Sequence, residues 1–189
     1  MKFIVDAMLG KLAKWLRILG YDTLYSNKYS DWEILKRAEK DGRVVVTRDK
    51  TLYKKAVKKG IQAVLTPYGD SVDLVDTLAA VALSTGISLD FDPARTRCPV
   101  CNTRLVRISK AEALSYVPED VWRKYDEFWR CPKCGKVYWR GRHWETITDK
   151  LERAKELVRV STVAGRSNNA GRAKQGARRV PGEARQESG

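Results

Sequence analysis

The sequence is poor in several features that would point to common classes of enzyme or membrane protein. It has a single histidine, His143, among 189 residues, which leaves no Ser/His/Asp or Cys/His arrangement near the acids of its first half. No apolar run is long enough to span a bilayer, and the N-terminus lacks the basic region, apolar stretch and cleavage site of a signal peptide. We therefore expect a cytoplasmic protein.

Acidic residues are scarce relative to basic ones. The chain has 23 Asp and Glu against 37 Lys and Arg, a net charge of +14, which indicates a polyanionic partner such as nucleic acid. Most of the excess lies after residue 92, so the first half is the better place for carboxylate chemistry. With 43% hydrophobic residues, the chain can form one full core and a small appended unit.

Two short apolar runs in the first half each end in an acid. Residues 2–6 run into Asp6, and residues 42–49 run through three valines and Thr47 to Asp49. Such runs between helical stretches are typical of parallel strands buried on both faces. Because open parallel sheets bind ligands at the carboxyl ends of their strands, the two acids stand where a site is expected. Alternatively, each acid is an ordinary strand-end or helix-capping residue.

Helical patterns alternate with these runs and favour an α/β fold, a parallel sheet with helices on both faces. Further strands are expected at residues 21–25 and 61–66, and helices at 7–19, 30–41, 50–59 and 71–85. Ser30 and Glu33 match a capping box. Asp31 next to Ser30 either favours the helix dipole or supplies a third carboxylate. Lys11, Lys14 and Arg17 share a helix face, which is either solvated or, for the two lysines, in contact with phosphate.

Two CxxC pairs dominate the second half, at Cys98 and Cys101 and at Cys131 and Cys134. Four thiolates in two close pairs are typical of structural zinc with no open coordination position. The 29 residues between the pairs are more than a usual ribbon has, so we expect an inserted element. Residues 110–129 are predicted to be mostly helical, with Trp122, Tyr125, Phe128 and Trp129 on the inserted helix, and residues 137–139 to form a ribbon strand.

A basic and aromatic loop follows the second pair, with the RNA-binding candidates Arg140, Arg142, His143 and Trp144. Arginines and aromatics mixed in this way can hold phosphates and stack on bases, although the aromatics could instead fill a small core. Residues 149–160 are predicted to form a closing helix. Residues 161–189 have little to bury, so we predict a disordered basic tail that adds affinity for nucleic acid.

These motifs together resemble the Mut7-C ribonuclease family. The resemblance rests on Asp6-x-Met-Leu-Gly-x-Leu-Ala-x-Trp-Leu-Arg-x-Leu-Gly-Tyr-Asp22, on Arg43-x3-Thr47-Arg48-Asp49, and on the two CxxC pairs with Tyr138-Trp139-x-Gly141. It implies a PIN-like nuclease domain over residues 1–92, a zinc ribbon with a helical insertion over residues 93–160, and a tail at 161–189 outside the family.

The resemblance also implies a mechanism. Asp6, Asp31 and Asp49 would bind Mg²⁺ or Mn²⁺, which orients a water molecule and stabilises charge on the scissile phosphate of RNA. The further acid that a usual PIN domain carries on an earlier helix has no clear match here. Lys11, Lys14 and Arg48 would hold the RNA backbone, and Thr47 would position the water. The substrate could be ribosomal RNA or tRNA.

Two other functions remain open at this stage. One is a non-catalytic RNA- or ribosome-binding protein with a vestigial acidic site, and the other is a DNA-binding regulator.

Overall fold

The computed structural model describes residues 1–175, and its first half is built on a four-stranded sheet. The strands are β1 (Lys2–Val5), β2 (Asp22–Tyr25), β3 (Val44–Thr47) and β4 (Ala63–Leu65), in the order β2-β1-β3-β4. All three pairings are parallel, with Val5 opposite both Tyr25 and Val46. The predicted parallel sheet is confirmed, and its carboxyl edge lies just before Asp6 and Asp49.

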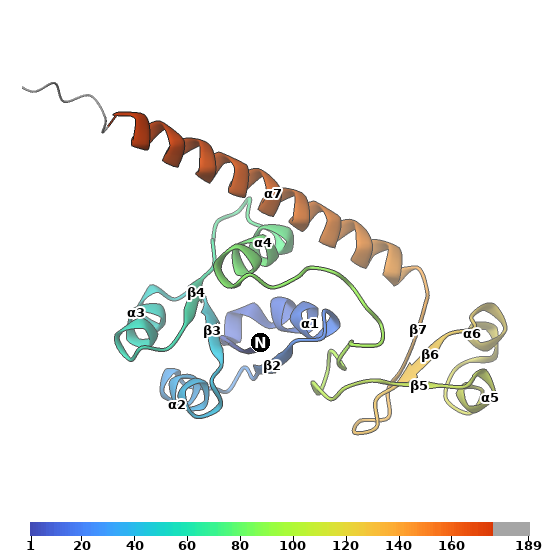
Figure 1. Ribbon diagram of the computed structural model, residues 1–189. Coiled ribbons are helices and arrows are strands. Elements are labelled where there is room, and N and C mark those ends of the chain that lie inside the picture. The colour runs from blue at the N-terminus through green and yellow to red at the C-terminus, as the bar shows by residue number, and fades with distance from the viewer. Residues whose placement is uncertain (176–189) are drawn as a thin grey trace, which may run out of the picture.

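Helices cover both faces of this sheet because alternate strand residues point to opposite sides. Phe3 and Val5 pack in one apolar cluster, whereas Ile4 packs in the other. The first cluster holds side chains of α1 (Gly10–Ile18) and α4 (Leu74–Thr85), and a 3-10 turn (η1, Ala7–Leu9) precedes α1. The second holds α2 (Asp31–Asp41) and α3 (Lys50–Lys58). Figure 1 shows the helices around the sheet.

The second unit contains a three-stranded antiparallel sheet. Its strands are β5 (Val106–Ile108), β6 (Phe128–Arg130) and β7 (Val137–Trp139), and the insertion carries the short helices α5 (Lys110–Ala113) and α6 (Glu119–Lys124). The prediction that the inserted helix carries Tyr125, Phe128 and Trp129 is wrong. Tyr125 already has an extended backbone, and the next aromatics pair across strands, Phe128 with Trp139. Such cross-strand aromatic pairs favour strand over helix.

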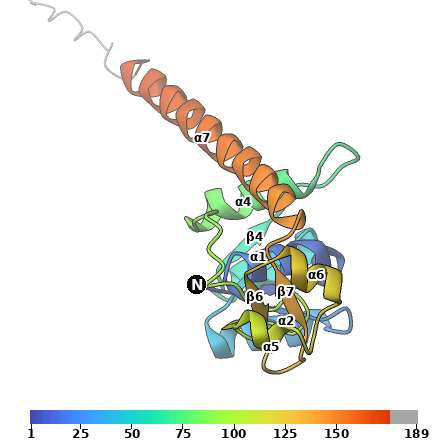
Figure 2. The same ribbon diagram turned by 90° about the vertical axis from the view of Figure 1, so that its right-hand side faces the viewer.

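The C-terminal helix α7 (His143–Gln175) returns to the first unit and lies along α4 in both views (Figures 1 and 2). Leu151 and Ala154 are buried in the cluster that contains α1 and α4. The helix extends through residues 161–175, so the start of the predicted tail is helical rather than disordered. A helix that is already anchored by packing needs no new nucleus to continue, so it can extend into a segment that also contains poor helix formers such as Gly, Ser and Asn. Residues 176–189 of that predicted tail lie outside the described residues.

The first cysteine pair is docked against the first unit. Arg17 on α1 is only 6% exposed and donates hydrogen bonds to the backbone oxygens of Thr23, Pro99 and Val100. Its predicted position on a solvated face with Lys11 and Lys14 is therefore wrong. Arg17 follows the buried Ala13 by one helical turn, which places it at the margin of the buried face.

No helix in residues 1–175 is long and apolar enough to cross a membrane.

Candidate active site and metal centre

Asp6 and Asp49 are linked through the hydroxyl group of Thr47. The Thr47 hydroxyl donates to Asp6 Oδ2 at 2.7 Å and accepts from the backbone N–H of Asp49 at 2.9 Å. Thr47 is fully buried at the end of β3. The buried hydroxyl therefore fixes the first predicted acid relative to the backbone of the second.

Each of these two carboxylates also caps a helical segment. Asp6 Oδ1 accepts from the backbone N–H of Ala7 at 2.6 Å, and Asp49 Oδ1 accepts from that of Thr51 at 2.6 Å. The alternative prediction, that both acids are helix-capping residues, is thus confirmed. It is compatible with metal binding, because a carboxylate has lone pairs left after one such bond. Asp49 Oδ2 makes no hydrogen bond in the described part of the chain.

Asp31 lies at the start of α2 and forms an ion pair with a residue of α3. Lys55 Nζ is 3.0 Å from Asp31 Oδ2, and both side chains are about half exposed. Ser30 and Glu33 form the predicted capping box, so Asp31 is not the capping residue of this helix. Asp31 is not gathered with Asp6 and Asp49 into one compact set of ligand atoms, since the only such set in residues 1–175 is that of the cysteines. Lys55 was missed from the sequence because no spacing rule connects it with Asp31.

The basic candidates of the first unit differ in their environments. Lys11 and Lys14 are exposed on α1, and neither makes a hydrogen bond or an ion pair within the part of the chain that the structure describes. Arg48 stands between Thr47 and Asp49, and its Nε is buried without a hydrogen-bond partner. Arg130 Nε in the second unit is likewise buried without a partner, so this property alone does not mark Arg48 as a binding residue.

The four cysteines form a compact cluster in which all sulfur atoms lie within 4.8 Å of one another. Cys98 Sγ is 3.6 Å from Cys134 Sγ, and Cys101 Sγ is 3.3 Å from Cys131 Sγ. These separations exceed the length of a disulfide bond, about 2.05 Å. They are close to the edge of about 3.8 Å that a tetrahedron with Zn–S bonds of about 2.3 Å requires. The cluster could therefore hold a zinc ion, as the spacing predicts.

Neighbouring hydroxyl groups support the cluster. The Tyr138 hydroxyl lies 3.2 Å from Cys98 Sγ, and it must donate once the sulfur is a thiolate, because a thiolate only accepts. Burial raises the pKa of the Cys101 thiol, but hydrogen bonds with Thr103, Cys131 and Cys98 together outweigh burial and bring that pKa well below its ordinary value. Burial raises the pKa of Tyr138, so this group keeps its proton. From the sequence, Tyr138 was placed in a strand and in the motif that carries the resemblance. Its approach to Cys98 was not predicted, because that contact depends on the fold.

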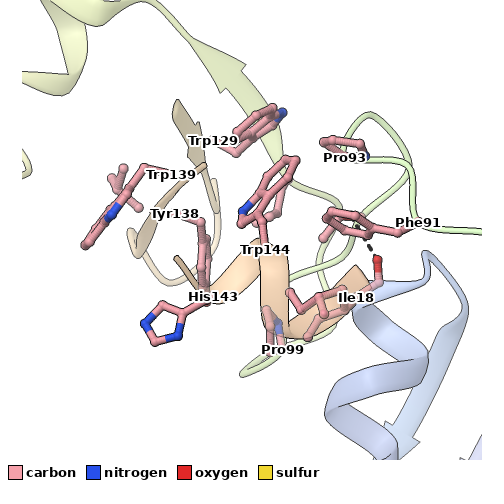
Figure 3. Close-up of a pocket in the computed structure, with 13 residues that line it drawn as sticks. Ile18, Phe91, Pro93, Pro99, Trp129, Tyr138, Trp139, His143 and Trp144 are labelled. Carbon is pink, nitrogen blue, oxygen red and sulfur yellow. Dashed lines mark hydrogen bonds between the residues drawn. The ribbon is translucent and has the colours of Figure 1, made fainter. Parts of the chain in front are cut away.

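The basic loop of the second unit lies beside an apolar pocket (Figure 3). Trp144 packs against Trp129, with ring centroids 5.2 Å apart, and the Arg140 guanidinium lies 5.5 Å from the Trp144 ring. Arg140 also bonds to Glu127 at 3.2 Å. Arg142 and His143 are exposed. The structure thus brings the four RNA-binding candidates together, but at the C-terminal end of α1, away from the acids.

A protein-family model described as the Mut7-C RNAse domain matches residues 1–151. The chain belongs to the Mut7-C RNAse domain family. The match spans the parallel sheet, both cysteine pairs and the start of α7, which agrees with the resemblance seen in the motifs. Comparisons with curated proteins and with solved structures each found no match.

Membership of the Mut7-C RNAse domain family supports ribonuclease activity in general and an RNA substrate. The two candidate metal sites of this domain lie at opposite ends of its parallel sheet. Asp6 and Asp49 follow the carboxyl ends of β1 and β3, whereas the first cysteine pair docks near Asp22, where β2 begins. The cysteine cluster is therefore remote from the acids and suited to a structural role.

Proposed function

We propose that the protein is a ribonuclease that hydrolyses RNA phosphodiester bonds and depends on Mg²⁺ or Mn²⁺ at Asp6, Asp31 and Asp49. The observation that carries the proposal is the Thr47 hydroxyl, which joins Asp6 Oδ2 to the backbone of Asp49 at the carboxyl edge of the sheet. A buried hydroxyl that orients a carboxylate in this way is common beside metal ligands. Family membership supports the same reaction class.

The chemistry of the carboxylates supports such an ion, although Asp31 is held apart by Lys55. Carboxylate oxygens are the preferred ligands of Mg²⁺ and Mn²⁺, and one Asp49 oxygen carries no hydrogen bond in the described structure. A bound divalent ion would stabilise the negative charge that develops on the scissile phosphate, and it would lower the pKa of a bound water molecule. Thr47 holds Asp6 in place, and the Thr51 backbone N–H holds Asp49. Arg48, with Lys11 and Lys14 on α1, would bind the RNA backbone, and the zinc ribbon would add affinity for RNA.

The decisive experiment compares cleavage of labelled structured and single-stranded RNA, including ribosomal and transfer RNA fragments, with Mn²⁺, with Mg²⁺ and with neither ion. The variants are Asp6→Asn and Asp49→Asn, and Asp120→Asn on the exposed helix α6 is a matched control. We expect the wild type and the control to cut only with a divalent ion, and both site variants to bind RNA without cutting. Zinc content should be the same in all four proteins.

A second function, non-catalytic binding of RNA or ribosomes, is favoured by one observation. Asp31 is held by Lys55 rather than gathered with the other acids. If the wild type and both site variants bind RNA equally and none cuts any substrate with either ion, this function replaces the first. A preference for duplex DNA in competition binding would instead indicate a DNA-binding regulator.

The ion pair of Asp31 allows a separate test of its place in the site. In the Lys55→Gln variant, the Asp31 carboxylate loses its neighbouring cation. We therefore expect the cleavage rate to reach half of its maximum at a lower Mn²⁺ concentration. The change should be at most about fivefold, since exposed ion pairs contribute about 0.2–1 kcal/mol. Lys58→Gln on the same helix is the control. An unchanged Mn²⁺ requirement in Lys55→Gln would remove Asp31 from the proposed ligands.

A further inference from the structure

An apolar pocket of about 300 Å³ lies between the two units of the protein. Figure 3 shows Trp144 at its centre, with Trp129 and Phe91 on neighbouring sides. The remaining lining comes from the end of α1, from residues 93–105, from β7 and from the start of α7. The pocket thus joins the two units and is separate from the carboxylates at the other end of α1.

This hollow is a cleft that is open to solvent. Most of its lining residues are half-buried, and His143 is exposed. Apolar surface that is gathered in one place and left uncovered commonly marks a binding site. A flat apolar ligand would cover surfaces that now lack a partner, and about 300 Å³ is the lower end of the usual size of ligand sites.

Aromatic faces determine which ligand would fit. Trp144 makes an edge contact with Phe91, with centroids 4.8 Å apart and planes at 77°, and lies tilted by 32° on Trp129. The indole N–H groups of Trp129 and Trp144 have no hydrogen-bond partner within the described residues, so they remain available to a ligand. A heteroaromatic ring with acceptor atoms, such as a nucleobase, matches this combination of ring faces and donors.

A second hollow, with a basic lining, lies next to the pocket, and Trp144 lines both of them. It has a volume of about 550 Å³. Its lining has three basic residues, Lys124, Arg140 and Arg142, and two acidic ones, Glu145 and Asp149. Arg142 is exposed and makes no hydrogen bond or ion pair in the described part of the chain. One tryptophan therefore borders both an apolar pocket of base-like dimensions and a surface with a free guanidinium.

We propose that this junction pocket binds one unpaired base of an RNA strand, stacked on Trp144, while Arg142 and Lys124 hold a neighbouring phosphate. The inference rests on the proposed function for the identity of the polymer, and it adds a base-binding site that is distinct from the cleavage site. α1 has nine residues and is about 14 Å long, and Asp6 precedes its start whereas the pocket residue Ile18 is at its end. A bound strand must therefore extend along the protein to reach both sites.

The first test leaves the protein intact and changes the RNA. Asp6→Asn protein, which should not cut, is titrated with single-stranded oligonucleotides in which one nucleotide at a time is abasic, and binding is measured by fluorescence anisotropy. We expect loss of one particular base to weaken binding about 5- to 150-fold, the range that corresponds to stacking energies of about 1–3 kcal/mol. Equal affinity for every abasic oligonucleotide would overturn the proposal.

The second test changes the pocket. Trp144→Leu should weaken binding of intact RNA about as much as loss of the base does, Trp144→Phe should keep most of the affinity, and the abasic RNA should bind all three proteins alike. Arg142→Ala should weaken both RNAs, because it acts on phosphate, with Arg123→Ala on α6 as the control for charge. The thermal midpoint and zinc content confirm that each variant is folded. If folded Trp144→Leu binds intact RNA as the parent does, the pocket is not a base site.

These outcomes separate the pocket from the cleavage reaction. If no cleavage occurs under any condition but binding depends on one base and on Trp144, the ribonuclease proposal fails and the base-binding site stands. If cleavage depends on Asp6 and Asp49 while binding is indifferent to abasic positions, the ribonuclease stands and the pocket proposal fails. Cross-linking of 4-thiouridine RNA should place the base at Trp129 or Trp144, and cross-links confined to residues 1–90 would contradict it.

Discussion

Asn102, in the turn of the first cysteine pair, donates a hydrogen bond from Nδ2 to Asp22 Oδ1 at 2.7 Å, at the start of β2. Its own Oδ1 accepts from the backbone N–H of Thr23 at 3.0 Å. Asn102 has a positive φ of 66°, which asparagine tolerates better than most residues. The tight turn that brings two cysteines into the cluster is therefore also the turn that binds the parallel sheet.

Removal of zinc should destabilise the whole chain, including the parallel sheet, because the turn that contacts β2 is shaped by its two cysteines. A structural zinc site contributes about 10 kcal/mol or more, and each kcal/mol corresponds to about 2–4 °C in a chain of this size. We expect a chelator to lower the thermal midpoint by more than about 10 °C and to speed hydrogen exchange in β2.

The control for this measurement is Cys98→Ser, which should resemble the chelated wild type and respond little to chelator. Unchanged exchange in β2 after verified zinc loss would show that the two units are energetically independent.

Asp22 should make stability depend on pH in the acidic range. Burial raises the pKa of Asp22, but hydrogen bonds from Arg43 and Asn102, together with the charges of Arg43 and Arg97, outweigh burial, so the pKa lies below its ordinary value of 3.8. The unfolded chain then binds a proton more readily than the folded chain. The stabilisation is complete above pH 3.8 and is lost as the pH falls through the lower folded pKa.

Asp22→Asn should therefore cost about 2 kcal/mol near neutral pH, the value of a hydrogen bond to a charged group. The difference from the wild type should shrink below pH 3.8, as measured by urea unfolding across pH. A difference that stays constant down to pH 2 would exclude the Asp22 carboxylate as its cause. Asp70→Asn, whose carboxyl lies on an exposed loop, is the control.

Thr47→Val should separate the orientation of the acids from the acids themselves. The substitution keeps the shape of the side chain but removes the hydroxyl that donates to Asp6 and accepts from the Asp49 backbone. Loss of such a supporting group typically reduces activity or metal affinity about 10- to 100-fold. Cleavage at saturating Mn²⁺ and the Mn²⁺ dependence measure the two effects, and Thr47→Ser should retain both. Full activity in Thr47→Val would show that Asp6 needs no such support.

Leu151→Ala should test whether α7 belongs to the core of the first unit. Leu151 is 2% exposed and packs in the cluster that contains α1 and α4, so truncation should cost about 2–5 kcal/mol. Leu157 on the same helix is 39% exposed, and Leu157→Ala should cost much less. Denaturant unfolding measures both, and equal losses would mean that α7 is bound only loosely to α4.

Local patterns predicted the parts of the structure that depend on neighbouring residues. The valines between Gly42 and Thr47 predicted a buried strand, and the acid after them was therefore expected at the edge of the sheet. The capping box of Ser30 and Glu33 is likewise a matter of three-residue spacing. The cysteine cluster was predicted from the two-residue spacing within each CxxC pair. A structural zinc site of this kind requires four sulfur ligands, and it tolerates an insertion between the two pairs.

Features that depend on long-range contacts could not be predicted in this way. The burial of Arg17 requires the oxygens of Pro99 and Val100, which are more than 80 positions away. Helix spacing alone grouped it with Lys11 and Lys14. The strand at Phe128 and Trp129 depends on partners in β5 and β7, whereas the sequence shows only a continuing run of aromatics. Lys55 and Tyr138 approach their partners only after the chain has folded.

β2 is one of the two outer strands of the parallel sheet, and on its open side the backbone N–H of Thr23 donates a hydrogen bond to Asn102. Unpaired outer strands are templates for pairing with another chain, and proteins commonly cover them. We therefore expect the cysteine turn to hinder pairing of β2 with another chain. A chain that loses its metal would expose a row of unpaired backbone groups, so failure of the zinc site should lead to aggregates as well as to a less stable monomer.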